Sequence, residues 1–437
     1  MRRSLILCLT VAAGSTLLTG PTGAGADEPD APACDQRAPT FRPPLRLGNG
    51  YGYEPGIEMD SQGTIFVTAH KLSLVAEGDR LASWLWRSTD DGRSFQDMSG
   101  VDGFPKLLWA LEGDFAVDEK DRLYWVDTWA ADNHFIRWSN RGTTVDFLRP
   151  FVASGQPVDD RPWLAAHGDG YVYYMGNMAV GTPAHARLFV NRSTDGGQTF
   201  DPVGFSFPNS NWGFLDADPT SPYVYAVMDE TNTSNMVAWV SPDRGSTWTR
   251  RVIAPVSPAR AGSDLEFPSM AVSPVDGTVY ALWDNNSGIF LAESRDRGTT
   301  WTVHNVTPFA GGYSFPWVTV GPTGDVGIIF SADPQSVAGN GYFVYGMVWR
   351  PGSDCLLDPE NPGSMCTGPS RIYGRLQPGS TGDRASQADF FQVEMSADNA
   401  LNVPWTDRNQ GSIIEYTRQS AGPNMDGTPT CGLVGTP

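Results

Sequence analysis

The 437-residue chain has 49 acidic and 30 basic side chains, and its formal net charge of −19 excludes a surface suited to nucleic acid or anionic membranes. Only 18% of the residues are charged, whereas 48 glycines, 34 prolines and 15 tryptophans suit many short strands joined by tight turns. The length excludes one small core and fits one large closed β architecture.

The chain begins with the composition of a secretory leader. MRR precedes the apolar run LILCLTVAAGSTLL, and the small residues AGA follow at 24–26. Because this run is too short to span a membrane permanently, we expect residues 1–26 to be a signal peptide. We therefore expect a secreted, extracellular protein with a linker at 27–39 and no membrane span. The sequence leaves the export route open.

A pair of apolar strands joined by an Asp- or Gly-rich turn recurs along the chain. The repeats stand at 54–69, 113–127, 161–175, 213–227, 267–282, 315–330 and 391–405. Their spacing is about fifty residues, apart from one longer interval, and a repeat of this length signals a radial or stacked array.

A second repeat, a hairpin, follows four of these units. Its copies are RSTDDGRSF (87–95), RSTDGGQTF (192–200), VSPDRGSTW (240–248) and ESRDRGTTW (293–301). Glycine permits the positive φ of a tight turn, and Asp and Ser hydrogen-bond the turn backbone. We therefore predict that Asp90, Asp195, Asp243 and Asp296 stabilise hairpins and have no catalytic role.

Four strands per unit, repeated radially, predict an all-β propeller of four-stranded antiparallel blades. Seven blades match the seven units, and six is the alternative. The last unit is one strand short, and TFRPPLRL (40–47) can supply its outer strand. We expect one propeller over 40–431, with an insertion near 351–385 and a tail at 432–437. The hairpins, as turns between third and fourth strands, should lie on the face opposite the central pocket.

Four cysteines remain after the leader: Cys34, Cys355, Cys366 and Cys431. An even number in an oxidising compartment indicates disulfides, and three pairings are possible. Cys355 and Cys366 bracket a Pro/Gly-rich segment, so we expect them to close a local loop. The other two would then join the ends of the chain.

The pocket face should carry a ring of acids. The second strands end at Asp127, Asp229, Asp284, Asp333 and Asp407, with His70 and Asn177 in the other two units. The first strands start at Glu54, Glu112 with Asp114, Asp160 with Arg161, Glu266, Tyr313 with Ser314, and Asp389. Crowded carboxylates raise one another's pKa and can separate into an acid and a base, and their oxygens can also bind Ca²⁺. Many of these acids would, alternatively, cap strands. Trp163 could stack on a sugar or pack between blades.

The hairpins resemble the Asp-box, or BNR, repeats of sialidases and related propellers, over roughly residues 50–420. This resemblance implies an enzyme with a Tyr nucleophile, an assisting Glu, an Asp acid/base and three arginines that hold the substrate carboxylate. Tyr313, Glu266 and Asp79 stand in segments similar to those that carry the three catalytic groups.

The arginines do not match. Glu54 and Asp284 stand where the family has arginines, whereas Arg161 and Arg408 are on the expected face outside the motif. A substrate carboxylate would meet like charge there, so a true sialidase is not expected.

We therefore expect a monomeric glycoside hydrolase that acts on an extracellular glycan or glycoconjugate. It should require no cofactor, although structural calcium could be present. The alternative is a non-catalytic propeller that binds glycan, peptide or calcium. The candidate substrate-binding residues are Glu54, Asp160, Arg161, Trp163, Asp284, Asp389, Asp407 and Arg408.

Overall fold

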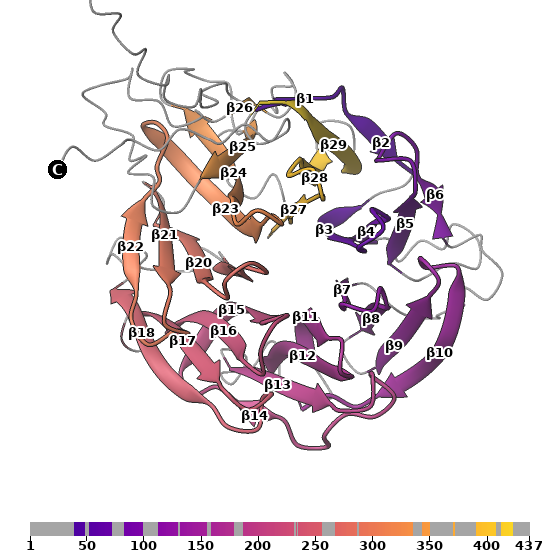
Figure 1. Cartoon of the computed structure of the whole chain (residues 1–437), viewed down its shortest axis with the longest axis vertical. Helices are drawn as coiled ribbons and strands as arrows, with labels where there is room; N and C mark the ends of the chain where they lie inside the picture. Colours follow the sequence, from indigo (N-terminus) through magenta and orange to yellow (C-terminus); the bar gives the residue numbers. More distant parts are fainter. Residues whose placement is uncertain are drawn as a thin grey trace, which may run out of the picture. The chain divides into compact units, whose positions relative to one another are not determined.

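Seven antiparallel sheets are arranged around one axis in the computed structural model (Figure 1). The structure describes residues 39–48, 52–71, 83–98, 112–129, 132–154, 159–178, 187–230, 233, 235–255, 267–285, 288–334, 343–349, 370–371, 390–407 and 412–422. Every regular element among them is a strand apart from a one-residue turn of 3₁₀ helix. The all-β propeller with seven blades is confirmed, and the six-bladed alternative is wrong.

Each blade runs outward from an innermost first strand. Blade 1 contains β3 (Tyr53–Met59), β4 (Ile65–His70), β5 (Trp84–Ser88) and β6 (Gln96–Asp97). Blade 2 contains β7 (Glu112–Val117), β8 (Leu123–Trp129), β9 (Asp132–Ser139) and β10 (Thr144–Phe151). Blade 3 contains β11 (Asp159–His167), β12 (Tyr171–Met178), β13 (Leu188–Ser193) and β14 (Phe205–Ser206). Blade 4 contains β15 (Ser210–Ala217), β16 (Val224–Glu230), β17 (Asn235–Ser241) and β18 (Thr249–Pro255).

The remaining blades repeat this order. Blade 5 contains β19 (Ser269–Val272), β20 (Val279–Asp284), β21 (Ile289–Ser294) and β22 (Thr302–Asn305). Blade 6 contains β23 (Gly311–Val320), β24 (Val326–Pro334), β25 (Phe343–Trp349) and β26 (Ser370–Arg371). Blade 7 contains β27 (Glu394–Met395), β28 (Leu401–Asp407), β29 (Ile413–Ala421) and the N-terminal strands β1 (Thr40–Phe41) and β2 (Leu45–Leu47).

Burial follows position within the blade. The second strands β4 and β20 are buried at every residue, because neighbouring blades cover both of their faces. No side chain of the outer strand β10 is buried, and exposed and half-buried positions alternate along its first five residues. This difference explains why the first two strands of each unit read as apolar runs in the sequence.

The N-terminal segment closes the ring, as the sequence predicts. Leu45, Arg46 and Leu47 pair antiparallel with β29, and Phe41 pairs with Gln419 of the same strand. Between these neighbouring blades, the Gln392 side chain accepts a 3.0 Å hydrogen bond from the Ile57 amide and so joins blade 7 to blade 1. The predicted disulfides Cys34–Cys431 and Cys355–Cys366 lie outside the described residues, as do the leader and the tail.

The four hairpins share one hydrogen-bond pattern. In the 192–200 copy, the Asp195 carboxylate accepts from Ser193 Oγ at 2.9 Å, from the Thr199 amide at 2.9 Å and from Thr199 Oγ1 at 2.6 Å. Gly197 has φ of 81° at the turn, and a Cβ there would lie 2.1 Å from the Phe135 ring. Asp90, Asp243 and Asp296 make the equivalent bonds, which confirms their turn-stabilising role.

Aromatic rings pack across the middle of the axis. Trp163 lies 4.6 Å from Phe390, 5.2 Å from Phe214, 5.6 Å from Trp317 and 5.7 Å from Phe267, measured between ring centroids. These rings come from different blades and form part of one buried cluster. They separate two ends of the axis. One end carries the starts of the first strands and the ends of the second strands, and we call it the cluster end after the charged residues described below. The other end carries the turns that join the first to the second strands and the four hairpins, and we call it the hairpin end.

Candidate functional site

The same backbone feature starts the first strand in three blades. A β-bulge interrupts the pairing at Tyr53–Gly56, Asp160–Trp163 and Ser314–Trp317. The second residue of each bulge has positive φ although it is not glycine, namely Glu54 (51°), Arg161 (56°) and Phe315 (54°), and a proline follows each. Such backbone costs free energy and re-aims a side chain. In blades 1 and 3 the re-aimed side chain is charged.

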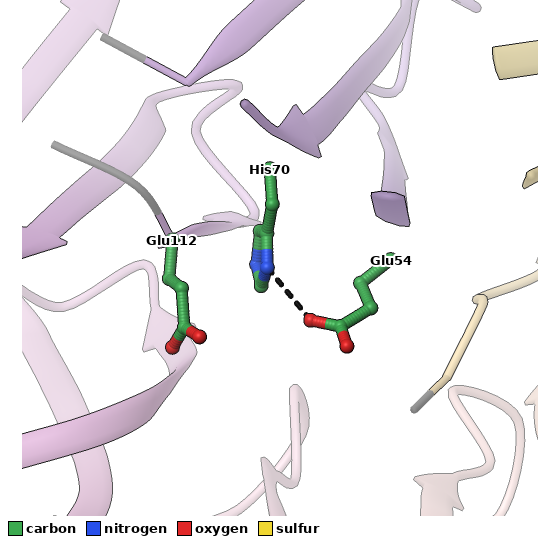
Figure 2. Close-up of side chains that lie close together, drawn as sticks. All are labelled: Glu54, His70 and Glu112. Atoms are coloured by element: carbon green, nitrogen blue, oxygen red, sulfur yellow. Dashed lines mark ion pairs between the residues drawn. The ribbon is translucent and has the colours of Figure 1, made fainter. Parts of the chain in front are cut away.

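These charged side chains meet others at the cluster end, between blades 1, 2 and 3. His70 Nδ1 lies 2.7 Å from Glu54 Oε2, and Figure 2 shows the Glu112 carboxylate on the other side of the imidazole. Arg161 binds Glu112 twice, through its backbone amide at 3.0 Å and through Nη1 at 2.8 Å. The same Nη1 is 3.6 Å from Glu54 and 3.8 Å from Asp160. We call Glu54, His70, Glu112, Asp160 and Arg161 the charged cluster.

The electrostatics of the charged cluster separate its two neighbouring acids. Burial alone would raise the pKa of Glu112, but the nearby Arg161 and His70 lower it below its ordinary value. Burial, together with the charge of Glu112, raises the pKa of Asp160 to about 7. Carboxyls whose environments push their pKa values apart are the usual source of an acid and a base in one site.

The carboxylate partner of His70 favours its protonated form. Burial alone would lower the pKa of the imidazole, but the charge and hydrogen bond of Glu54 outweigh burial and raise it above the ordinary value. His70 then donates from Nδ1 to Glu54. The pair resembles the acid–histidine pairs that fix a side chain in one orientation.

Glu54, His70 and Glu112 each place a ligand atom within 4.8 Å of the others, a spacing that suits a metal ion. However, Arg161 Nη1 lies 2.8 Å from Glu112 and 3.6 Å from Glu54, which are two of these three groups. A metal ion among them would face this guanidinium at close range and be repelled. The three residues therefore fit an ion-pair network better than a metal centre, and structural calcium stays a prediction.

The described residues also line an axial cavity of about 340 Å³ at the hairpin end. Turn residues such as Ser61, Asp121 and Pro219 mark its mouth. These turns share the face of the hairpins, since the Gly196 amide of one hairpin bonds the Gly170 carbonyl. We expected the pocket on the opposite face, so this cavity corrects the sequence prediction. Repeat counting cannot show where side chains fill the axis.

Four acids line this cavity from four blades, Asp114 buried and the other three half-buried: Glu58, Asp114, Asp216 and Glu394. Burial raises the pKa of Asp114 and of Asp216 to about 7 and that of Glu394 to about 8. Burial and the three other acids raise the pKa of Glu58 well above its ordinary value. Asp114 and Asp216 also accept hydrogen bonds from backbone amides of the following blade. The donors are Leu164 at 2.8 Å for Asp114 and Val272 at 2.9 Å for Asp216.

Two predicted site residues occupy core positions. Trp163 is fully buried among aromatic rings, so its faces cannot stack on a sugar, which corrects that expectation. Tyr313 is also fully buried, packs against Phe309 and Phe330, and donates its hydroxyl hydrogen to the Phe309 carbonyl. This environment fits a core tyrosine better than a nucleophile open to substrate.

The remaining predicted residues divide into three groups. Glu54, Asp160 and Arg161 come together in the charged cluster, whereas Asp284 and Asp407 are buried at the ends of β20 and β28 in blades 5 and 7. The other four predicted residues, Asp79, Glu266, Asp389 and Arg408, lie outside the described residues.

Two members of the charged cluster were not selected as site residues from the sequence. His70 and Glu112 stood in the predicted ring, but nothing distinguished them from its other members. A usable signal was the repeated charged residue before proline, Glu54-Pro55 and Arg161-Pro162, which marks the two bulges. His70 ends the second strand that pairs with the bulge in blade 1, and Glu112 starts the first strand of blade 2, which lies between the two bulged blades. The two bulges therefore indicate both residues.

Comparison with known proteins gives likenesses in fold. No family model and no curated protein matched the sequence. A Hadza microbial sialidase shares 16% identity over 65% of this chain and 66% of its own, with a TM-score of 0.46. An α-L-arabinanase from Penicillium chrysogenum shares 12% over 87% and 99%, with a TM-score of 0.47. The NanB sialidase from Streptococcus pneumoniae shares 12% over 87% and 70%, with a TM-score of 0.44.

The sheet topology by itself shows that the chain is a seven-bladed β-propeller. The matched region spans 66% of the Hadza sialidase, just under two thirds of its length. At these identities no residue role is transferred from any of the three proteins. No helix in the described part of the chain is long and apolar enough to cross a membrane.

Proposed function

We propose that this protein is an exported glycoside hydrolase whose reaction centre is the charged cluster. One observation carries the proposal: two carboxyls, Asp160 and Glu54, both lie within 4 Å of Arg161 Nη1, and burial together with the charge of Glu112 raises the pKa of Asp160 to about 7. The carbohydrate class follows from the Asp-box resemblance of the hairpins, and the acid–base chemistry follows from the geometry of the cluster.

The separation of the two carboxyls has an upper bound that is compatible with hydrolysis. Their oxygens are 3.6 Å and 3.8 Å from the same nitrogen, so they lie at most about 7.4 Å apart, which admits the roughly 5–5.5 Å of retaining glycosidases and the lower part of the 6.5–9.5 Å range of inverting ones. Asp160, with its pKa raised to about 7, can keep a proton near neutrality and act as general acid. Glu54, paired with His70 at 2.7 Å, supplies the second carboxyl and acts as general base.

The bond changes can be assigned to these two groups. Glu54 takes a proton from water while the water oxygen bonds to the anomeric carbon. The bond from that carbon to the leaving oxygen breaks, and Asp160 gives its proton to this oxygen. Glu54 then releases the proton it took to the solvent and Asp160 takes one up from it, so both carboxyls return to their starting states and atoms and charge balance over one turnover.

A neutral sugar is the expected substrate. Glu112 holds Arg161 through two bonds, and Glu54 and Asp160 flank the same guanidinium. A substrate carboxylate would therefore find no uncommitted guanidinium here and would meet like charge. Sialosides should be poor substrates.

The test is an assay of the secreted chain on chromogenic glycosides of neutral sugars and on a sialoside, with a glycan array in parallel. We expect turnover of at least one neutral glycoside, and its loss in Asp160→Asn and Glu54→Gln. Glu394→Gln, at the opposite end of the axis, is the matched control and should remain active.

Three outcomes would change the proposal. Efficient sialoside cleavage would overturn the specificity. Loss of activity in Asp79→Asn and Tyr313→Phe, with activity kept in Asp160→Asn, would move the reaction centre to the residues nominated by the resemblance. Array binding with no turnover of any glycoside would favour the non-catalytic binding protein.

A further inference from the structure

A second cavity, of about 310 Å³, lies between blade 3 and the hairpin of blade 4. It has the size at which small-molecule pockets begin. Its walls include both aromatic and polar side chains: Tyr173, Arg192, Asp201, Phe205, Ser246 and Trp248. Val203 also lines the cavity and is 83% exposed, so the cavity opens to solvent. No residue of the charged cluster or of the axial cavity lines it.

A short outer strand leaves this space open. Phe200, which ends the hairpin of blade 3, packs on the preceding blade, with its ring centroid 4.6 Å from that of Phe151 in the eight-residue outer strand β10. Trp248 ends the hairpin of blade 4 in the same way, but the outer strand β14 of blade 3 has only two residues. The Trp248 ring centroid lies 6.0 Å from that of Phe205 in β14. Because β14 supplies fewer side chains than β10, the groove beside Trp248 is not filled.

The cavity contains one ion pair that leaves an acceptor available. Arg192 Nε and Nη2 both lie 3.1 Å from the same oxygen, Asp201 Oδ2. Arg192 Nη1 donates to Ser246 Oγ at 2.6 Å and to the Arg244 carbonyl at 3.3 Å. The guanidinium is therefore committed to protein groups. Both bonds to Asp201 use Oδ2, and its side chain is 46% exposed, so Oδ1 can accept a hydrogen bond from a ligand.

Trp248 adds a donor that has no partner. Its indole N–H is buried and makes no hydrogen bond within the described part of the chain, although the side chain as a whole is only half-buried. An indole N–H can only donate, and buried polar groups are normally hydrogen-bonded. A ligand oxygen bound in the cavity would supply the acceptor. The lining thus offers one donor, one acceptor and aromatic surface, and the charges of Arg192 and Asp201 cancel.

We propose that this cavity is an accessory binding site for one neutral sugar residue. A hydroxyl group both donates and accepts. Hydroxyls of one sugar can therefore donate to Asp201 Oδ1 and accept from Trp248 Nε1, while the aromatic rings contact its C–H groups. A charged ligand would be left without a counter-charge, because Arg192 and Asp201 already neutralise each other. The site goes beyond the proposed function, since it does not depend on catalysis at the charged cluster.

Blade 2 contains a matched control. Arg137 Nε donates to Asp146 Oδ2 at 2.8 Å, and its Nη1 donates to the Gly196 carbonyl of the next hairpin at 3.2 Å. This arrangement repeats that of Arg192, so the ion pair by itself joins neighbouring blades, and the open space beside it distinguishes blade 3. In blade 2 the Phe147 ring covers Arg137, with 4.8 Å between Cζ and the ring centroid. Asp146→Ala therefore removes the same kind of ion pair in a groove that aromatic rings fill.

The experiment is a ¹⁹F NMR titration of the full chain labelled with fluorotryptophan, with the Trp248 signal assigned by its loss in Trp248→Phe. The probes are methyl glycosides of neutral hexoses and pentoses, and a methyl sialoside. We expect at least one neutral glycoside to shift this signal saturably. Asp201→Ala should weaken that binding about tenfold, or about 1.4 kcal/mol, as for one hydrogen bond to a charged group. Asp201→Asn should weaken it in the same direction and serves if the alanine variant does not fold. Asp146→Ala should leave it unchanged.

A Trp248 signal that no neutral glycoside shifts would overturn the proposal. A stronger response to the sialoside, or equal weakening in Asp201→Ala and Asp146→Ala, would overturn it as well. The result is separate from catalysis, because Asp160→Asn should keep this binding while it loses turnover. Binding at Trp248 without turnover of any glycoside would keep this site and reject the proposed function.

Discussion

The two ends of the propeller axis gather acids in opposite electrostatic settings. At the cluster end, three acids surround Arg161 and stand beside His70, whose protonated form Glu54 favours. At the hairpin end, the described residues lining the 340 Å³ cavity include no Lys, Arg or His. The negative charge of the first group of acids is offset mainly by cations. The acids of the second group bind protons or accept hydrogen bonds from backbone amides.

This difference decides what each end can do near neutral pH. Ionised carboxylates remain available where a guanidinium or an imidazolium offsets their burial. Where no cation is near, burial raises the pKa values of acids such as Glu58, and that of Glu394 reaches about 8, so this acid stays mostly protonated at neutral pH. The number of acids around an axis therefore says little about function until their partners are known.

The largest expected effect tests whether chemistry belongs to the cluster end. Asp160→Asn should lower turnover by roughly 10²–10⁴-fold, the usual contribution of a general acid, while the amide keeps the fold. Glu394→Gln should leave turnover of the same glycoside within about twofold. Steady-state kinetics of the two purified variants check this, and equal losses would remove the functional distinction between the ends.

Removing the cation should make the cluster end resemble the hairpin end. The Arg161 side chain is only 14% exposed and its Nη1 lies 2.8 Å from Glu112, so Arg161→Met removes the cation from the surrounding acids although the backbone amide of residue 161 still bonds Glu112. Breaking a buried pair costs about 3–5 kcal/mol, and partial exposure should reduce this to about 2–4 kcal/mol. Urea unfolding at pH 7 measures the loss. A smaller loss at pH 5, where the acids can protonate instead, would identify its cause.

The acids of the hairpin end should make the free energy of unfolding fall as the pH rises. An acid with a raised pKa in the folded protein ionises first in the unfolded chain, so rising pH favours unfolding. For Glu394 this loss begins near the ordinary value of 4.5 and continues to about 8, at no more than about 1.4 kcal/mol per pH unit. Unfolding curves of wild type and Glu394→Gln between pH 5 and 9 test it. The variant should show the shallower decline, and parallel curves would contradict the prediction.

Repeats and turns made most of the fold predictable from the sequence. Seven two-strand units, the Asp turns and the missing outer strand are local features, and each has one plausible solution in a propeller. The closure by residues 40–47 followed from counting strands. The cysteine pairings and the residues outside the described ranges stay predictions.

The site was less predictable, because its geometry depends on the bulges and on axial packing. The sequence did not show that Glu54 and Arg161 adopt positive φ, and this backbone directs them to His70 and Glu112. Nor did it distinguish Trp163, buried by four other rings, from a tryptophan on a pocket wall. Contacts between blades far apart in sequence decide both cases.

The smallest expected effect concerns a hairpin acid that belongs to neither end's buried group. Asp195 is solvent-exposed, and Asp195→Ala removes three hydrogen bonds within one turn, to Ser193 and Thr199. Exposure lets water replace part of each bond, so the loss should be about 1 kcal/mol in urea unfolding. Turnover of the folded variant should match wild type, because the hairpin lies on the face opposite the charged cluster. A folded Asp195→Ala protein with reduced turnover would show that the hairpin face takes part in the reaction.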